Sequence, residues 1–166
     1  MLNKNYLVPI LMGSGSDWKG HGEKLALELE LLGISYEVHV VSAHRTPKDL
    51  LKLIEDYNAM DIDLVFETIA GLSNGLSGMV AGATTYPVIA VPPKSIDGST
   101  IDYPSSYNMP PGISVIFIPD PKNAALCAAK ILGIKYPELR KTVENVLEEC
   151  RKNVIDANEK YKKVKW

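Results

Sequence analysis

Short apolar runs of strand length alternate along this chain with segments whose apolar residues recur at helical spacing. The first run, over residues 6–12, is apolar throughout, as expected of a strand that is covered on both faces. Such alternation is typical of βα units, in which the strands lie parallel in one sheet. We therefore expect an α/β fold, with residues 1–166 forming a single domain.

The patterning also predicts where the elements begin and end. We expect strands over 6–12, 36–41, 62–69, 87–91 and 113–118. Asp17 is expected to cap the first helix, and Thr46 with Asp49 to form a capping box at the second. A polar loop over 71–78 leads into an apolar helix over 79–83, and two further helices are expected over 121–132 and from 137 towards 163.

Composition excludes several classes of protein. The net charge is −2 and only 7% of residues are aromatic, which argues against a nucleic-acid surface. No stretch reaches the roughly 18 apolar residues that a membrane span needs, so we expect no membrane partner. Cys127 and Cys150 have no partner at zinc-ligand spacing, which favours reduced thiols, no metal site and a cytoplasmic location.

Ligands of an open parallel sheet bind beyond the carboxyl ends of its strands, so the loops that follow the first three strands belong together. These loops are 13–17, 42–45 and 71–78, and all three are rich in small or polar residues. A fourth connection, over 92–112, has no helical or alternating pattern. Loops of that length are usually functional or form an interface.

The first loop combines glycines, hydroxyls and a following helix, a combination that binds phosphate. A tight strand-to-helix turn that merely needs glycine is the alternative. Trp18 stands where a dinucleotide fingerprint needs its third glycine, so the sequence disfavours NAD. A carboxylate at Asp17 could cap a helix or accept hydrogen bonds from sugar hydroxyls.

His44 is the most informative of the three histidines. It precedes a helix N-terminus and stands beside Arg45, and both disfavour the protonated imidazole. A neutral imidazole can take and return a proton, while a guanidinium binds phosphate or carboxylate. The ordinary interpretation, a surface or hydrogen-bonded histidine, is preferred for His21 and His39.

An apolar stripe runs along the otherwise highly charged final helix. A long helix that projects from a small domain is expected to pack on a neighbouring subunit. The stripe consists of Leu139, Val143, Val146, Leu147 and Val154.

Several segments together resemble the PurE family, the aminoimidazole ribonucleotide carboxylases and mutases of purine biosynthesis. The resemblance is carried by residues 13–18 (GSGSDW), 42–47 (SAHRTP), 76–79 (LSGM), 109–112 (MPPG) and 123–126 (NAAL). It implies a three-layer α/β/α sandwich with a parallel sheet, of flavodoxin or Rossmann type. It also implies a homo-oligomer, either tetramer or octamer, with a long C-terminal helix used in assembly.

The third loop separates the two branches of that family. The mutase branch carries a second histidine where Gly75 stands, whereas residues 70–78 (AGLSNGLSG) resemble the branch that uses carbon dioxide directly. Leu72 replaces the arginine usual in that branch. Arg45 stands where lysine is more common there and arginine is found among mutases.

The resemblance implies carboxylation of 5-aminoimidazole ribonucleotide by CO2 to 4-carboxy-5-aminoimidazole ribonucleotide, with no cofactor or metal. It implies that His44 is the catalytic residue. The implied substrate-binding residues are Ser14, Ser16, Asp17, Ser42, Ala43 and Arg45 for the ribose phosphate, and Gly71, Ser73, Asn74 and Leu76 for carbon dioxide. Two alternatives remain open: a mutase of N-carboxyaminoimidazole ribonucleotide, and a flavodoxin-like nucleotide-binding module without catalysis.

Overall fold

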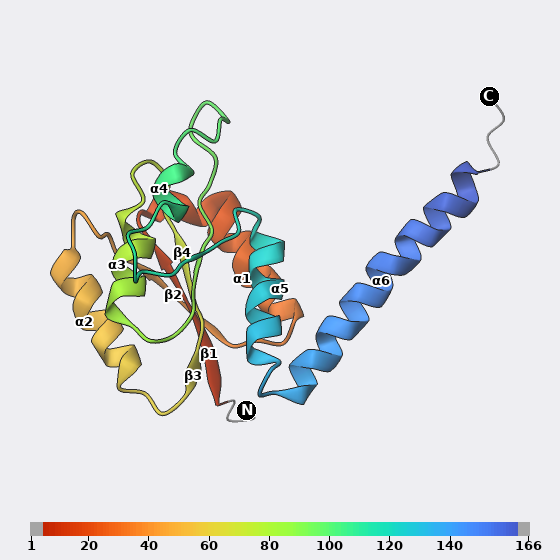
Figure 1. The fold of residues 1–166 in the computed structure, drawn as a ribbon, viewed down its shortest axis with the longest axis horizontal. Helices are drawn as coiled ribbons and strands as arrows, with labels where there is room; N and C mark the ends of the chain where they lie inside the picture. Colours follow the sequence, from red (N-terminus) through yellow and green to blue (C-terminus); the bar gives the residue numbers. More distant parts are fainter. Residues whose placement is uncertain (1–4, 163–166) are drawn as a thin grey trace.

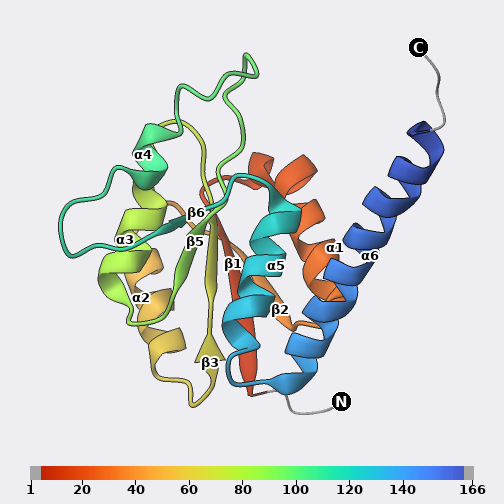
Figure 2. The same ribbon diagram turned by 45° about the vertical axis from the view of Figure 1, so that its right-hand side comes forward.

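Parallel strands cross the middle of the molecule, and helices cover both faces of the sheet, as Figure 1 and Figure 2 show from two directions. The structure is a computed structural model that describes residues 5–162. The strands are β1 (Tyr6–Met12), β2 (Tyr36–Val40), β3 (Asp63–Leu64), β4 (Phe66–Ile69), β5 (Val88–Ala90) and β6 (Ile116–Phe117). The helices are α1 (Glu23–Leu31), α2 (Pro47–Asn58), α3 (Gly75–Ala83), α4 (Pro104–Tyr107), α5 (Pro121–Leu132) and α6 (Pro137–Tyr161).

The strand order is β2-β1-β4-β5-β6, and β3 pairs with β1 just before β4 begins. All pairs are parallel, with Met12 beside Val40 on one side and beside Ile69 on the other. With β3 and β4 counted as one interrupted strand, this is the flavodoxin-like order, whose direction of winding reverses at β1. The expected parallel sheet is confirmed.

Two apolar cores fill the space between the sheet and its helices. One core packs α1 and α5 against the sheet, with Leu25 and Leu29 completely buried. The other packs α2 and α3 against the opposite face through Leu50, Ile54 and Val80. The molecule is therefore a three-layer α/β/α sandwich, as predicted.

Glu67 lies among apolar side chains on the central strand β4. Its neighbours in register are Ile10 on β1 and Ile89 on β5, and its side chain is completely buried. Neither carboxyl oxygen has a hydrogen-bond partner in the described part of the chain. Desolvation raises the pKa of Glu67 to about 8.

Two expected helix caps are absent. Asp17 does not cap the first helix: its carboxylate accepts from the backbone N–H of Ser14, and Gly20 with φ of 90° interrupts the chain before α1 begins. Between β1 and α1 lie two short helical turns, Gly15–Asp17 and Trp18–Gly22. The capping box at Thr46 is also absent, because the Thr46 hydroxyl accepts from the Ser42 N–H instead.

The third helix begins at Gly75, four residues earlier than expected, because the Asn74 side chain accepts from the Ser77 N–H and caps it. The long connection 92–112 contains the short helix α4, which no pattern in the sequence predicts. Cys127 and Cys150 are free thiols. Within residues 5–162, no helix has both the length and the apolar character needed to span a membrane.

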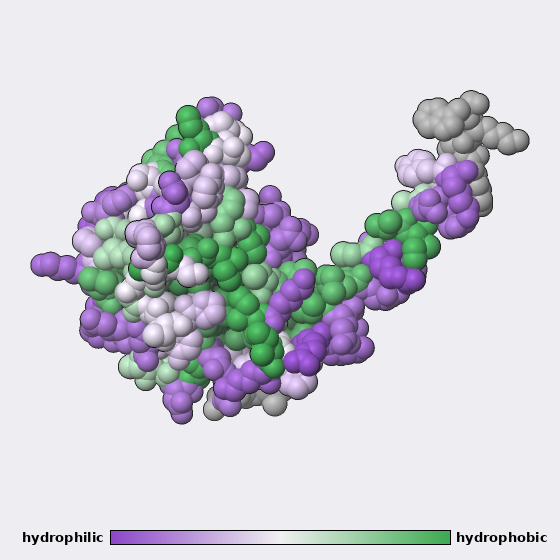
Figure 3. Space-filling view, in the orientation of Figure 1, coloured by the Kyte–Doolittle hydropathy of each residue, from purple (hydrophilic) through white to green (hydrophobic). Residues whose placement is uncertain are grey.

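Helix α6 leaves the domain and extends away from it in both ribbon views (Figures 1 and 2). Its first turns are anchored in the core by the buried Leu139 and Val143. Further along, Leu147, Val154 and Ile155 are exposed, and Figure 3 shows apolar side chains continuing along this projecting part. The expected end of the helix near residue 163 lies outside the described residues, and it ends at Tyr161.

Candidate active site

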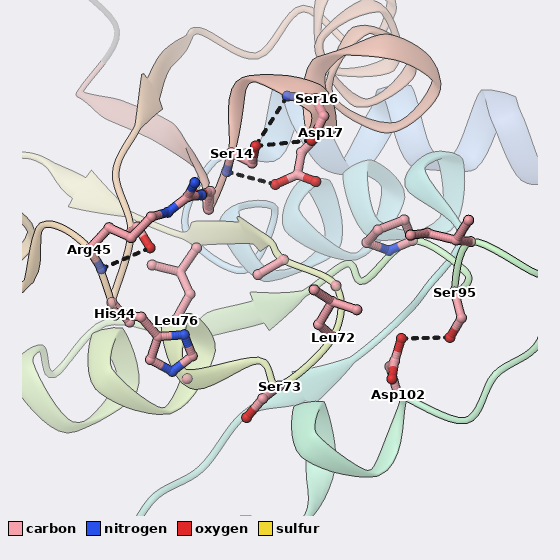
Figure 4. A pocket seen from close by; sticks show the side chains of 18 of the residues that line it. Ser14, Ser16, Asp17, His44, Arg45, Leu72, Ser73, Leu76, Ser95 and Asp102 are labelled. Atoms are coloured by element: carbon pink, nitrogen blue, oxygen red, sulfur yellow. Dashed lines mark hydrogen bonds between the residues drawn. The ribbon is translucent and has the colours of Figure 1, made fainter.

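A cavity of about 600 Å³ opens at the carboxyl ends of the central strands, where the winding direction of the sheet reverses. Loops that follow β1, β2, β4 and β5 line it, so residues far apart in the sequence share one wall (Figure 4). This is the position at which open α/β sheets bind their ligands.

The loop after β1 is folded back on itself by its own polar groups. The Ser14 N–H donates to Asp17 Oδ2 over 2.9 Å, and the Ser16 hydroxyl donates to Ser14 Oγ over 2.9 Å. Gly13 fits closely against the end of β4, since a Cβ at position 13 would lie 3.3 Å from the Cβ of Ala70. The hydroxyls and the carboxylate therefore lie together at one end of the cavity.

The loop after β2 brings the His44 imidazole and the Arg45 guanidinium to the same wall. Thr46 and Ser42 bond to each other through side chain and backbone, and the Arg45 N–H donates to Ser42 Oγ. Arg45 Nη2 reaches across to the first loop and donates to the Gly13 carbonyl over 2.7 Å. The exposed imidazole of His44 lines the cavity and has no hydrogen bond to any residue in the described range 5–162.

Gly75, the first residue of α3, lies directly against His44. A Cβ at Gly75 would be 2.8 Å from His44 Nε2, a distance that real Cβ atoms essentially never show. The absence of a side chain at this position is therefore what makes room for the imidazole.

Burial is the main cause of the pKa shifts in this region. It raises the pKa of Asp17, while the Ser14 N–H and the nearby His21 and Arg45 act in the opposite direction. Burial also lowers the pKa of His21, whose Nε2 lies 3.3 Å from the carbonyl oxygen of Pro119. Among residues 5–162, no group of three or more His, Cys, Asp or Glu side chains is placed to hold a metal ion.

The structure brings ten of the eleven predicted site residues together in this cavity. They are Ser14, Ser16, Asp17, Ser42, Ala43, His44, Arg45, Gly71, Ser73 and Leu76. Asn74 is the exception: its side chain is buried beneath the loop, where it caps α3 and donates to Ser106 Oγ.

The connection after β5 supplies lining residues that the sequence analysis did not name individually. They are Pro93, Lys94, Ser95, Ile96 and Asp102. The Ser95 hydroxyl donates to Asp102 Oδ2 over 2.6 Å at the rim (Figure 4). The only signal for them was the length of the unpatterned segment 92–112, which predicted a function but no particular residue.

The strand order and the loop chemistry define a flavodoxin-like α/β protein whose pocket combines apolar walls with hydroxyls and a guanidinium that can bind an anionic group. Residues 7–153 match the family described as AIR carboxylase, so the chain belongs to this family. The predicted family resemblance is confirmed.

Individual relatives agree with this assignment. The chain is 41% identical over 157 residues to a protein from Treponema denticola named phosphoribosylaminoimidazole carboxylase, covering 95% of this chain and 98% of the relative. The crystal structure of Treponema denticola PurE superimposes with a TM-score of 0.91 over 95% of this chain and 99% of that one. A Saccharolobus solfataricus relative, 38% identical over 90% of this chain and 96% of its own, is named N5-carboxyaminoimidazole ribonucleotide mutase.

Proposed function

We propose that this protein carboxylates 5-aminoimidazole ribonucleotide with carbon dioxide in purine biosynthesis, as a single AIR carboxylase domain over residues 1–166. The proposal rests on family membership together with one observation: Gly75 lies against His44 and leaves the imidazole open to the cavity. The ring of the substrate is an enamine and already nucleophilic, so the site must mainly position CO2 in a water-excluding space and move one proton.

In the proposed reaction the ring carbon attacks CO2 and a carbon–carbon bond forms. The proton on that carbon then passes to His44, which restores the aromatic ring and leaves a carboxylate product. The hydroxyls of Ser14, Ser16 and Ser42 and the guanidinium of Arg45 are proposed to hold the ribose phosphate, with Asp17 and Ala43 beside them. Gly71, Ser73 and Leu76 are proposed to line the CO2 end, with Asn74 supporting it from below. No cofactor or metal takes part in this scheme.

The structure also bears on the choice between the two branches of the family. The Cβ of a histidine at position 75, the residue expected of a mutase, would lie 2.8 Å from His44 Nε2, so the imidazole could not keep the position it has here. Arg45 and the mutase-named relatives favour the other branch. We give more weight to Gly75 because it contacts the proposed base directly.

A paired assay tests the proposed function. One arm follows carboxylation of 5-aminoimidazole ribonucleotide with bicarbonate and carbonic anhydrase, and the other follows conversion of the N-carboxylated ribonucleotide while CO2 is scavenged. We expect turnover to track dissolved CO2. Turnover that survives scavenging and requires the N-carboxylated substrate would make the protein a mutase, and tight nucleotide binding without any turnover would make it a binding module.

His44→Asn tests the role of the imidazole. Because general acid–base help contributes roughly a hundred- to ten-thousand-fold, we expect turnover to fall by that range while nucleotide affinity stays within about twofold. Isothermal titration and steady-state rates measure the two quantities separately. Undiminished turnover would remove His44 from the mechanism.

We also propose that the protein works in the cytoplasm as a homo-oligomer, tetramer or octamer, with α6 as an assembly element. The exposed apolar residues beyond the anchored part of α6 support its role in assembly, because an isolated subunit would leave them in water.

A further inference from the structure

The segment 71–74, which joins β4 to α3, has an unusual backbone. Leu72 has φ of 56°, and among residues 5–162 it is the one non-glycine residue in the left-handed region. A branched side chain rarely adopts this conformation unless the surrounding structure holds it there. The Leu72 side chain is 66% exposed and faces the cavity, so packing of that side chain does not explain the conformation.

The contacts that hold this segment come from helix α4, about thirty residues later in the chain. Ser105 Oγ lies 2.9 Å from the Leu72 carbonyl oxygen, to which it can donate, and it accepts from the Asn74 N–H over 2.9 Å. One hydroxyl therefore spans the residues on both sides of Ser73. The carbonyl oxygen of Asp102, in the turn before α4, lies 2.7 Å from the same hydroxyl and shares its single hydrogen with the Leu72 carbonyl.

The neighbouring Ser106 extends the same attachment into the core. Asn74 Nδ2 donates to Ser106 Oγ over 3.0 Å and to Ser77 Oγ over 2.8 Å, and Ser77 Oγ in turn lies 2.8 Å from Thr68 Oγ1. All four side chains are buried. This continuous set of bonds ties the segment to strand β4 through Thr68. Breaking one bond would leave a buried polar group without a partner, which is costly.

Helix α4 is itself held firmly enough to act as a support. The rings of Tyr103 and Tyr107 pack edge-on against Phe117 of β6, with centroids 5.2 Å and 5.1 Å away. Aromatic pairs at this spacing and angle are favourable beyond the area they bury. A one-turn helix with no stability of its own is thus fixed to the sheet on one side and to the segment 71–74 on the other.

We propose that Ser105 is a positioning residue that clamps the segment 71–74, holds Leu72 in its left-handed conformation and so shapes the carbon dioxide end of the cavity. This inference rests on the proposed function. Ser105 does not line the cavity, so it acts through Leu72 and Asn74, whose neighbours Gly71 and Ser73 do line it. Without the clamp, Leu72 should relax to a negative φ and move that wall.

Ser105→Ala tests the clamp, with Ser105→Thr as the variant that keeps the hydroxyl and Ser99→Ala as a matched control. Ser99 belongs to the same connection but has no bond to the segment 71–74. We expect Ser105→Ala to lower kcat/KM for CO2 about tenfold, because the segment loses the acceptor of the Asn74 N–H and the shared donor to the Leu72 carbonyl. The KM for the ribonucleotide should stay within about twofold, Ser105→Thr should restore most of the loss, and Ser99→Ala should match the parent protein.

Hydrogen exchange of the unliganded protein provides a readout that does not depend on activity. In Ser105→Ala the Asn74 amide, which loses its acceptor, should exchange at least about tenfold faster, while amides of the central strand β1 keep their rates. If the parent protein shows no turnover but the Asn74 amide still exchanges faster in Ser105→Ala, the proposed function is overturned and the clamp is supported. Unchanged kcat/KM for CO2 in an active parent protein, or an equal rise in KM for both substrates, would overturn the clamp.

Discussion

Gly75 and His44 show how one missing side chain can determine a site. Alanine at position 75 would place its Cβ 2.8 Å from His44 Nε2, so the imidazole would have to move. We expect Gly75→Ala to lower kcat at least about tenfold with little change in ribonucleotide affinity, because general-base catalysis depends on hydrogen-bond geometry. Steady-state kinetics and titration calorimetry check this.

Gly82→Ala is the matched control, since it lies on the same helix and its new Cβ would meet only Ile113 Cδ1 at an ordinary 3.5 Å. It should fold and turn over like the parent protein. An equal loss of kcat in the two alanine variants would mean that α3 tolerates no added methyl group. The effect of Gly75→Ala would then not be due to its contact with His44.

Arg45 is the cation expected to meet the substrate phosphate. Its guanidinium already bonds to the Gly13 carbonyl, so the Arg45→Ala variant loses both a charged partner and a link between two loops. Because charge-assisted hydrogen bonds contribute about 1.5 to 3 kcal/mol, we expect the Kd for the ribonucleotide to rise roughly ten- to hundredfold. Lys48→Ala, which removes one positive charge outside the cavity, should leave Kd unchanged. An unaltered Kd in Arg45→Ala would reject the phosphate assignment.

On strand β4, burial of Glu67 should make the stability of the protein depend on pH. Its pKa is raised from 4.5 to about 8, so between these values the folded chain holds a proton that the unfolded chain has released. Stability is therefore fully present below pH 4.5 and falls by about 1.4 kcal/mol per pH unit until about pH 8. Urea denaturation at several pH values should show this slope, and Glu67→Gln should remove it. Glu30→Gln, at an exposed position of α1, should keep the slope, and a slope retained in Glu67→Gln would assign the effect to another group.

Helices and strands were predicted correctly where the apolar residues recur with a clear period. The predictions failed where one side chain could bond to either of two backbone partners. The strand over 6–12 and the helix over 121–132 have the expected bounds. By contrast, the Thr46 hydroxyl could bond forwards to cap α2 or backwards to Ser42, and it does the latter. Sequence spacing cannot decide such a competition because both partners lie within four residues.

At the scale of the whole molecule, the candidate site was predictable because parallel strands all end at one edge of a sheet. Loops that follow β1, β2 and β4 had to meet there, whatever their separation in sequence. The contribution of 93–102 could not be assigned in the same way. Its residues reach the cavity through contacts such as Ser95 with Asp102 and the packing of α4 on β6, which no periodic pattern encodes.

The projecting half of α6 predicts a contact between subunits. Val154 is 70% exposed and belongs to the apolar stripe of α6, beyond the turns that Leu139 and Val143 anchor in the core. If a second copy covers this face, Val154→Glu would bury an unpaired charge and split the oligomer into smaller species. Light scattering coupled to size exclusion measures the mass. Lys152→Glu, which also introduces a carboxylate but about half a turn round the helix, should leave the mass unchanged. An unaltered mass in Val154→Glu would show that the assembly does not use this face of α6.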